Sequence, residues 1–394
     1  MKILGRRFRF GDPEPVDIVI FDETNSHLVR KALNADYQVT VFNVRPEEIL
    51  IGFKVILYFF RFLGQFQLKE AVKYRRGLVI GVLKQLHCIY LEACLVAMKP
   101  KAVVTYIDNC SRFGWLSKNC RGFPFFAIQN GSRLSYAATD RSGYYVQHLF
   151  CYGTHEINLF PKLGYQVENF HPVGSLVASL HFDHQTVGSN EKYDLLVVST
   201  WRGNIGFQRD VKDTMRSMKI MDHLLVQYIR SSGAKAAVIL RSERGSKDWT
   251  MPEVGMSEQD YYHDIYGDCI DIIETDFSKR NIFPLMQESR VIVSCLSSAL
   301  MEAFGIGKKI LYCNFTGIEQ YHQDIDSSLV TSDDSYEYLA TRLDDLLEVS
   351  SIEYSQRHQE RQKYFMNYPE CKLTYQVIAE KIDAIIKKSG PLNV

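Results

Sequence analysis

The sequence has no excess of basic residues, and this absence bears on one large class of function. Its 46 lysines and arginines are balanced by 46 aspartates and glutamates, so the formal net charge is zero. Proteins that bind nucleic acid through phosphate contacts usually carry a basic surplus, because each phosphate contact uses a cationic side chain. We therefore do not expect nucleic acid as a partner.

Cysteine pairs and clusters of metal ligands are also lacking. The nine cysteines include no Cys-x-x-Cys pair, and the eleven histidines show no paired ligand spacing. Scattered cysteines of this kind are typical of reduced thiols in the cytoplasm. The acidic triplet Asp324-Ile-Asp326 lies in a polar stretch, and we interpret it as a solvated loop. We expect a cytoplasmic protein that needs neither a metal nor another cofactor.

The most apolar run is shorter than the roughly 20 residues that span a bilayer. The most apolar stretch, residues 49–63, contains Lys54 and Arg61, and the basic N-terminus is followed by acidic residues and prolines instead of a signal-peptide core. Basic residues flank this apolar stretch, namely Arg6, Arg7, Arg9, Lys69, Lys73, Arg75 and Arg76. Two interpretations stay open: peripheral contact with the anionic inner face of a membrane, or a solvated surface over a buried core helix.

Apolar strands alternate with helices along both halves of the chain. We expect strands at 17–21, 38–42, 102–107, 123–128 and 148–151, and helices at 47–63, 68–76, 78–98 and 154–163. In the second half we expect strands at 194–198, 236–240, 270–273, 290–294 and 309–313, and helices at 211–231, 282–288, 336–348 and 373–388. This alternation predicts an α/β fold with two Rossmann-like doubly wound domains. The polar stretch 181–193 is typical of a linker, which gives domains at 1–180 and 194–370 and a C-terminal helix and tail at 371–394.

One stretch of the second half, residues 290–314, has the pattern strand, turn, helix, strand. Ser297 and Ser298 stand where the helix begins, and Gly305 stands where it ends. The first turn of a helix has unpaired N–H groups and the positive end of the helix dipole, so it suits a phosphate. The alternative is that Ser297 only caps the helix.

Polar residues follow the predicted strands, where ligands of parallel sheets bind. The candidates in the first half are Asp22, Asp108, Asn109, Gln129, Asn130, Arg133 and Glu156. Those in the second half are Arg202, Asn204, Arg241, Glu243, Ser297, Ser298 and Glu302. Each also has a structural interpretation, because the aspartates suit helix caps and the arginines suit surface ion pairs.

The arrangement of two such domains, a central linker and a final helix resembles the GT-B glycosyltransferases. Residues 294–310 are similar to the donor-binding segment of that family, although Lys309 stands where proline is frequent. Residues 20–22, 44–47, 128–131 and 172–175 are similar to segments of bacterial transferases that build capsule, lipopolysaccharide and teichoic acid. The resemblance implies facing domains, a final helix that crosses back to the first domain, and a nucleotide-sugar donor (UDP-, GDP- or CMP-linked).

The resemblance also implies roles for the candidates. Ser297, Ser298 and the helix amides would hold the donor phosphates, and Glu302 would bind a sugar or ribose hydroxyl. A growing phosphate charge calls for a fixed cation, which we assign to Arg202 or Arg241.

The acceptor would be a glycan or a lipid-linked glycan, and its hydroxyl needs a base if the reaction inverts the sugar. Asp22, Asp108 and Glu156 are the candidates, and we prefer Asp108. A retaining reaction with a carboxylate nucleophile, a nucleotide-sugar epimerase, a CDP-polyol phosphotransferase and a non-catalytic scaffold stay open as alternatives.

Overall fold

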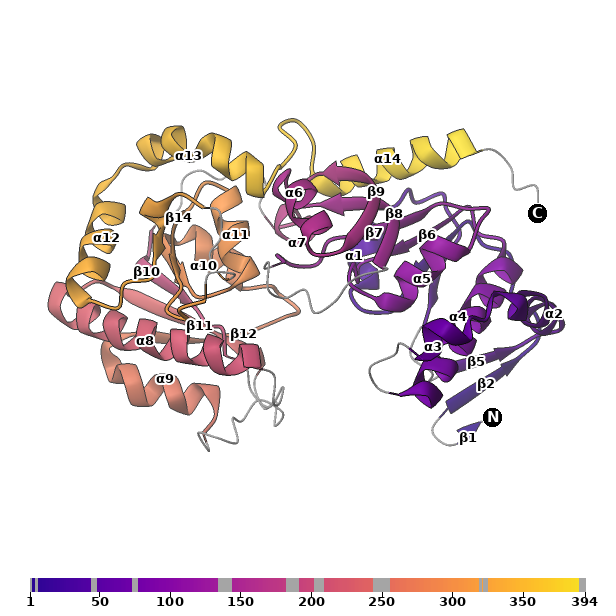
Figure 1. Cartoon of the computed structure of the whole chain (residues 1–394). Coiled ribbons are helices and arrows are strands. Elements are labelled where there is room, and N and C mark those ends of the chain that lie inside the picture. Colours follow the sequence, from indigo (N-terminus) through magenta and orange to yellow (C-terminus); the bar gives the residue numbers. More distant parts are fainter. Residues whose placement is uncertain are drawn as a thin grey trace.

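Two six-stranded sheets, in which all neighbouring strands are parallel, form the framework of the chain (Figure 1). The structure is a computed structural model and describes residues 2–3, 6–43, 48–72, 77–133, 144–181, 191–201, 209–243, 256–318, 321 and 325–389. Each sheet is covered by helices, as parallel sheets require, because right-handed crossovers bury both faces. The predicted α/β architecture with two doubly wound domains is confirmed.

The first sheet belongs to the N-terminal domain. Its strand order is β4 (Val39–Phe42), β3 (Ile18–Phe21), β6 (Ala102–Thr105), β7 (Phe125–Ile128), β8 (Tyr144–Cys151) and β9 (Tyr165–Pro172). Helices α1 (Ser26–Lys31), α4 (Leu78–Met98), α5 (Ser111–Asn119), α6 (His155–Lys162) and α7 (Leu176–Ser179) accompany it. Strands β3, β6 and β7 are buried at every residue, which explains their continuous apolar sequence.

The second sheet belongs to the C-terminal domain. Its order is β12 (Asp271–Thr275), β11 (Ala236–Glu243), β10 (Tyr193–Val198), β13 (Ser289–Ser294), β14 (Lys309–Cys313) and β15 (Val330–Thr331). Helices α8 (Arg209–Ser232), α9 (Glu258–Tyr266), α10 (Ile282–Gln287), α11 (Ser298–Gly305) and α12 (Tyr336–Glu348) accompany it. The predicted strand, turn, helix and strand of residues 290–314 are therefore β13, α11 and β14.

The prediction of one helix over residues 47–63 was wrong. Residues Glu48–Ile51 form strand β5, which pairs with β2 (Arg6–Phe10) in a small sheet that also includes β1 (Lys2–Ile3), and helix α2 (Phe53–Phe62) begins only after Gly52. The run is apolar throughout, so its period could not separate strand from helix. Pairing with β2, about 40 residues earlier in the chain, decides the outcome. After a single 3-10 turn, η1 (Leu63–Gln65), the short helix α3 (Leu68–Val72) leads towards α4.

Strand β9 was also missed, and β8 was predicted too short. The two strands pair in register from Tyr144 with Tyr165 to Cys151 with Pro172. Strand β9 lies at the edge of the sheet and is mostly exposed or half-buried, so its sequence lacks a buried apolar run. Edge strands of this kind give a weak signal in sequence.

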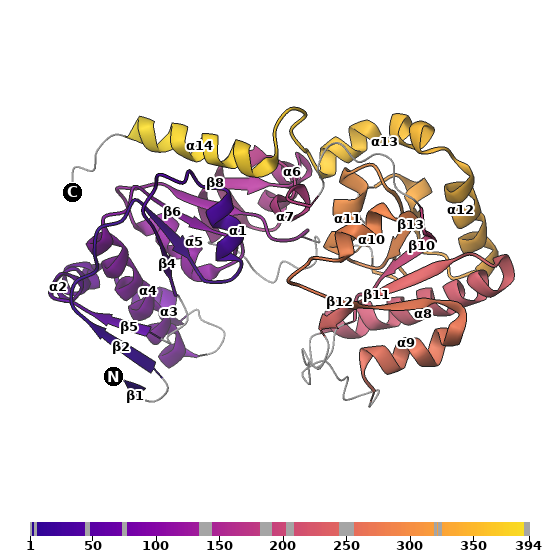
Figure 2. The same ribbon diagram turned by 180° about the vertical axis from the view of Figure 1, so that it is seen from behind.

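The C-terminal end of the chain returns to the first domain, as predicted. Helix α13 (Ser351–Phe365) lies beside α11, and α14 (Thr374–Ser389) then extends over the N-terminal sheet, as Figures 1 and 2 both show. Between them, the Asn367 amide donates to the Tyr152 carbonyl at 2.7 Å, and the Thr374 hydroxyl donates to the Val173 carbonyl at 2.6 Å. The domain boundaries stay predictions, and residues 182–190 of the expected linker lie outside the described residues.

Glycines allow this returning segment to approach both domains closely. A Cβ at Gly305, at the end of α11, would lie 2.3 Å from Met366 Cγ, and one at Gly174 would lie 2.4 Å from the ring of Tyr368. Gly174 belongs to the first domain and has a φ of +77°, which side-chain-bearing residues rarely adopt. The segment 366–368 therefore packs between the two domains because both surfaces lack a side chain there.

We expect Gly305→Ala to lower the free energy of unfolding by about 1–3 kcal/mol, because the added methyl overpacks buried Met366. The measurement is calorimetric or circular-dichroism melting of the full chain. Gly64→Ala is the control, since no atom lies within 4 Å of a Cβ at that position. Equal melting of both variants would show that the close approach at Gly305 has no energetic weight.

Candidate functional site

A cavity of about 600 Å³ lies at the carboxyl ends of strands from both sheets. Tyr106 follows β6, residues 130–133 follow β7 and Tyr152 follows β8 on the side of the first domain. The second domain contributes residues 198–200 after β10, 239–241 from β11, 275–277 after β12 and 296–299 at the start of α11. The expectation that loops at the strand ends face a common cleft is therefore confirmed.

The start of α11 forms one wall of this cavity. Ser297 is the N-cap, and its hydroxyl accepts from the Ala299 amide at 3.3 Å. The Ser298 hydroxyl accepts from the Ser132 amide of the first domain at 2.9 Å, and both serines line the cavity. A Cβ at Gly131 would lie only 3.2 Å from Ser298 Oγ, so the loop after β7 lies directly against α11. The helix start and the first domain meet at Ser298.

Glu302 lies one helical turn after Ser298 and also lines the cavity. Its Oε1 accepts from the Ser175 hydroxyl of the first domain at 2.5 Å. Burial raises the pKa of Glu302 to about 7, although the Ser175 hydrogen bond and the charge of Arg280 oppose the shift. A carboxyl group with this pKa exchanges its proton near neutral pH.

Asp108, the preferred base, is fully buried and does not belong to the cavity lining. Its Oδ1 accepts from the Arg133 guanidinium and, at 3.2 Å, from the Asn130 amide, while Arg133 also donates to Asn130 Oδ1 at 2.8 Å. Burial raises the pKa of Asp108, and the Arg133 charge opposes that shift. Asp108 therefore positions Arg133 and Asn130, which do line the cavity.

Gln129 and Glu156 form a second buried cluster behind the same loop. Gln129 Nε2 donates to Glu156 Oε1 at 3.1 Å and to the Gly131 carbonyl at 3.0 Å, and Glu156 Oε2 accepts from the Gly153 amide at 3.0 Å. Burial raises the pKa of Glu156 to about 7. Neither side chain is part of the cavity lining, so the pair holds the ends of β7 and β8 together.

Asp22 and Asn109 lie away from the cavity lining as well. Asp22 has a φ of +80°, and its Oδ1 accepts from the Thr24 amide at 2.9 Å, which closes the turn after β3. Asn109 is half-buried in the turn before α5. For Asp22, the structural interpretation as a turn-forming aspartate fits this geometry.

Arg241 lies in the cavity wall, as expected for a donor-binding cation. Its guanidinium donates to the Trp201 carbonyl at 3.1 Å, and its amide donates to Glu258 at 2.8 Å. Arg202, Asn204 and the side chain of Glu243 lie outside the described residues, so their roles stay predictions.

Two cavity residues were missed in the sequence. Thr200, two residues after β10, is 3% exposed and lines the cavity, and its hydroxyl has no hydrogen-bond partner among the described residues. Arg280, which has a φ of +51°, donates to Asn25 Oδ1 of the first domain at 3.2 Å. Thr200 lies two residues after the predicted strand 194–198, so a search of every strand end would have included it. Arg280 was not recognised because the residues just before it are exposed and gave no sign of a binding site.

The acidic triplet offers one described carboxylate. Asp326 Oδ1 accepts from the amide and hydroxyl of Ser328 at 2.9 and 2.8 Å, which caps a short 3-10 turn, while Asp324 lies outside the described residues. Within the described part of the chain, no three His, Cys, Asp or Glu side chains group as metal ligands. Independence of a metal stays an expectation.

We expect Ser175→Ala to raise the pKa of Glu302 further. The hydrogen bond that Ser175 donates stabilises the ionised carboxylate, and the variant lacks it. Carboxyl titration by infrared or NMR spectroscopy measures the shift. Ser179→Ala is the control, since that hydroxyl donates to the Leu176 carbonyl instead. An unchanged pKa in Ser175→Ala would contradict the contact.

The same titration has a consequence for stability. The folded pKa of Glu302 lies above its usual value, so the group favours the folded state most below about pH 4.5. That contribution is lost as the pH rises through about 7. Glu302→Gln should therefore flatten the pH dependence of the free energy of unfolding in this range.

The sequence matches no protein-family model and no curated protein sequence. Its fold, however, is similar to those of solved structures. A protein provisionally named UDP-N-acetylglucosamine 2-epimerase from Listeria monocytogenes aligns over 95% of this chain and 96% of its own, with a TM-score of 0.53 and 12% identity. The wall teichoic acid polymerase TagF aligns over 94% and 89%, with a TM-score of 0.53 and 11% identity.

A third structure is the UDP-GlcNAc 2-epimerase of Methanocaldococcus jannaschii, solved with UDP-GlcNAc and UDP. It aligns over 94% of this chain and 99% of its own, with a TM-score of 0.50 and 13% identity. These proteins are GT-B enzymes, and the similarity extends over nearly the whole chain in each case. The chain therefore has the GT-B fold.

Proposed function

We propose that the chain is an enzyme that binds a nucleotide-activated sugar in the cavity between its domains and transfers the sugar to a glycan or lipid-linked acceptor. The observation that carries this proposal is the position of α11, whose first turn lies at the carboxyl ends of both sheets. The GT-B neighbours include enzymes of nucleotide-sugar and teichoic acid chemistry, which supports the same class of substrate.

The donor phosphates are assigned to the wall formed by Ser297, Ser298 and the first amides of α11. The N-terminus of a helix attracts anions through its unpaired N–H groups and its dipole. Thr200, whose buried hydroxyl has no hydrogen-bond partner among the described residues, lines the same cavity. Arg241 and Arg280 line the same cavity and supply positive charge.

Transfer generates negative charge on the departing phosphate, and fixed cations lower the barrier by stabilising it. Arg241 and Arg280 serve this role without requiring a metal ion. Glu302 binds a hydroxyl of the donor, since its carboxyl group lines the cavity one helical turn from the phosphate site.

The acceptor side of the cavity is assigned to the loop 130–133. Asn130 and Arg133 of this loop line the cavity. Asp108, which is not part of the lining, accepts a hydrogen bond from Arg133 and holds it in place. Asp108 thus acts as a positioning residue in this proposal. Substitution of Asp108 should affect binding of the acceptor more than binding of the nucleotide.

An epimerase of a nucleotide sugar or a transferase of a polyol phosphate from a CDP carrier is the second candidate. The neighbours favour it, because they include UDP-GlcNAc 2-epimerases and TagF, one form of which was soaked with CDPG. An epimerase converts the donor without any acceptor, whereas a sugar transferase releases the nucleotide when an acceptor is added. Phosphorus and proton NMR of the donor distinguishes these outcomes.

We expect Ser298→Ala and Arg241→Ala to weaken nucleotide binding by about 10–100-fold each, because each removes a hydrogen bond to a charged phosphate. Isothermal titration calorimetry with UDP-, GDP-, CMP- and CDP-linked donors measures the affinity. Ser298→Thr keeps the hydroxyl and should retain most of it.

Arg357→Ala is the matched control, since Arg357 is exposed on α13 and pairs with Glu353. If no donor of this series binds the wild-type chain, the proposal of a nucleotide-sugar enzyme is wrong. Binding that survives both Ser298→Ala and Arg241→Ala would leave the nucleotide elsewhere and overturn the assigned phosphate site.

A further inference from the structure

Exposed apolar side chains gather at one end of the N-terminal domain. Of the fifteen large hydrophobic residues that are exposed in the described part of the chain, ten lie between residues 53 and 83. These residues belong to α2, α3 and the start of α4, which lie at the end of the first domain away from the second sheet in both views (Figures 1 and 2). A cluster of exposed apolar side chains on a folded domain indicates an interaction surface.

Helix α2 exposes a complete apolar stripe. Phe53, Ile56, Leu57 and Phe60 follow one another at the spacing of one helix face, and their exposed fractions are 78%, 44%, 56% and 65%. Val55, on the other face, is buried against the domain. The helix therefore packs with one apolar face and presents a second one to solvent.

The neighbouring helices extend this surface. Leu68 and Val72 of α3 are 57% and 62% exposed, and Val79 and Leu83 in the first turns of α4 are 71% and 60% exposed. Among the described helices, only α4 is long and apolar enough to cross a membrane, but its second half is largely buried. We therefore interpret α4 as a core helix. Its first turns are exposed and form part of the same apolar surface.

The exposed charged side chains described on these three helices are cationic, although exposed Asp12 lies beside the start of α2, where its carboxylate accepts from the Lys54 amide. Lys54, Arg61 and Lys69 are exposed on α2 and α3. The acidic residues of the three helices are Glu70, whose side chain lies outside the description, and Glu92, which is buried. In the sequence, Lys73, Arg75 and Arg76 follow α3 directly. Apolar side chains with a majority of cations beside them match the interface of a membrane with anionic lipids.

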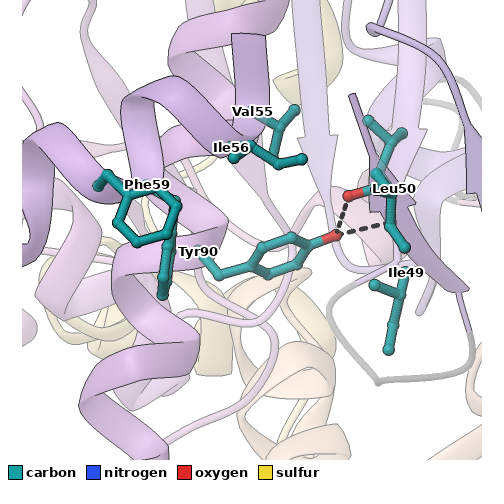
Figure 3. A pocket seen from close by; sticks show the side chains of 8 residues that line it. Ile49, Leu50, Val55, Ile56, Phe59 and Tyr90 are labelled. Atoms are coloured by element: carbon teal, nitrogen blue, oxygen red, sulfur yellow. Dashed lines mark hydrogen bonds between the residues drawn. The ribbon is translucent and has the colours of Figure 1, made fainter. Parts of the chain in front are cut away.

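A small hollow in the same region is suited to hydrocarbon. It has a volume of about 190 Å³ and lies between β5, α2 and Tyr90 of α4, with Ile56 and Phe60 at its wall (Figure 3). Its one polar side chain is satisfied, because the Tyr90 hydroxyl accepts from the Leu50 amide at 2.7 Å and donates to the Leu50 carbonyl at 3.2 Å. The lining offers no further polar group, so it favours the end of an alkyl chain.

We propose that the surface formed by α2, α3 and the first turns of α4 docks the protein on an anionic lipid bilayer. A second copy of the chain is a poorer occupant. A two-fold dimer through this surface would bring the patch that carries Lys54, Arg61 and Lys69 against the same cationic patch of the other copy. Phosphate-bearing lipids offer both the opposite charge and the apolar layer that the exposed side chains need.

The test is sedimentation of the full chain with vesicles at low salt. Wild-type protein should bind vesicles made of equal parts phosphatidylglycerol and phosphatidylcholine, and binding should weaken as salt rises. Leu57→Ser combined with Phe60→Ser should reduce the partition coefficient by at least about tenfold. The combined Lys54→Glu, Arg61→Glu and Lys69→Glu variant should show a similar loss.

Ile352→Ser is the matched control, because Ile352 is 73% exposed on α13 of the other domain. It should bind vesicles as the wild type does, and melting curves establish that all variants are folded. Equal binding of the wild type and the Leu57 and Phe60 variant, or no binding at all, would overturn the proposal.

Self-association is tested separately by sedimentation velocity without lipid. A wild-type dimer that the Leu57 and Phe60 substitutions dissociate would assign the surface to a second copy instead, and would equally overturn bilayer docking. Neither experiment involves the nucleotide, so its result is independent of the proposed donor site.

Discussion

Helix α11 is contacted by the first domain on two successive turns, and the geometry of the cavity depends on this contact. Ser298 accepts from the Ser132 amide, and Glu302 accepts from the Ser175 hydroxyl one turn later. The two contacts fix both the position and the direction of the helix relative to the loop after β7. Because the same two side chains line the cavity, the contact between domains and the wall of the site are one structure.

This arrangement has a cost in backbone conformation. Leu296, two residues before the helix, has a φ of +49°, a left-handed conformation that costs a leucine about 1–3 kcal/mol. Leu296 is 7% exposed and lines the cavity, so its side chain is held by packing. The turn brings the chain from the end of β13 into α11 within a few residues and leaves the helix start directed at the cavity. Arg280, with a φ of +51°, is a second cavity residue in the same conformation.

Local signals in the sequence predicted the scaffold well and the side chains that line the cavity less well. Residues 290–314 were recognised because a buried β-branched strand, two serines and a terminal glycine each follow a short-range rule. Asp108 and Glu156 were located correctly after their strands, but their partners, Arg133 and Gln129, are distant in sequence. A strand-end carboxylate that lines a cavity cannot be distinguished in sequence from one that supports the loop behind it. Thr200 was overlooked because only the structure shows that its hydroxyl is buried and lies at the cavity.

The apolar run at 49–63 shows that sequence alone does not tell a buried apolar face from an exposed one. Its composition is that of a core helix, and one face of α2 does pack inward, with Val55 buried and Tyr58, Phe59 and Phe62 partly buried against the core. The opposite face of α2 is also apolar, although it is exposed. A helix that served only the core would not need apolar residues on that face. Polar side chains there would improve solubility at no cost to packing, so the presence of Phe53, Leu57 and Phe60 points to a use outside the fold. Because cationic side chains lie beside them, we infer that the partner is anionic and partly apolar.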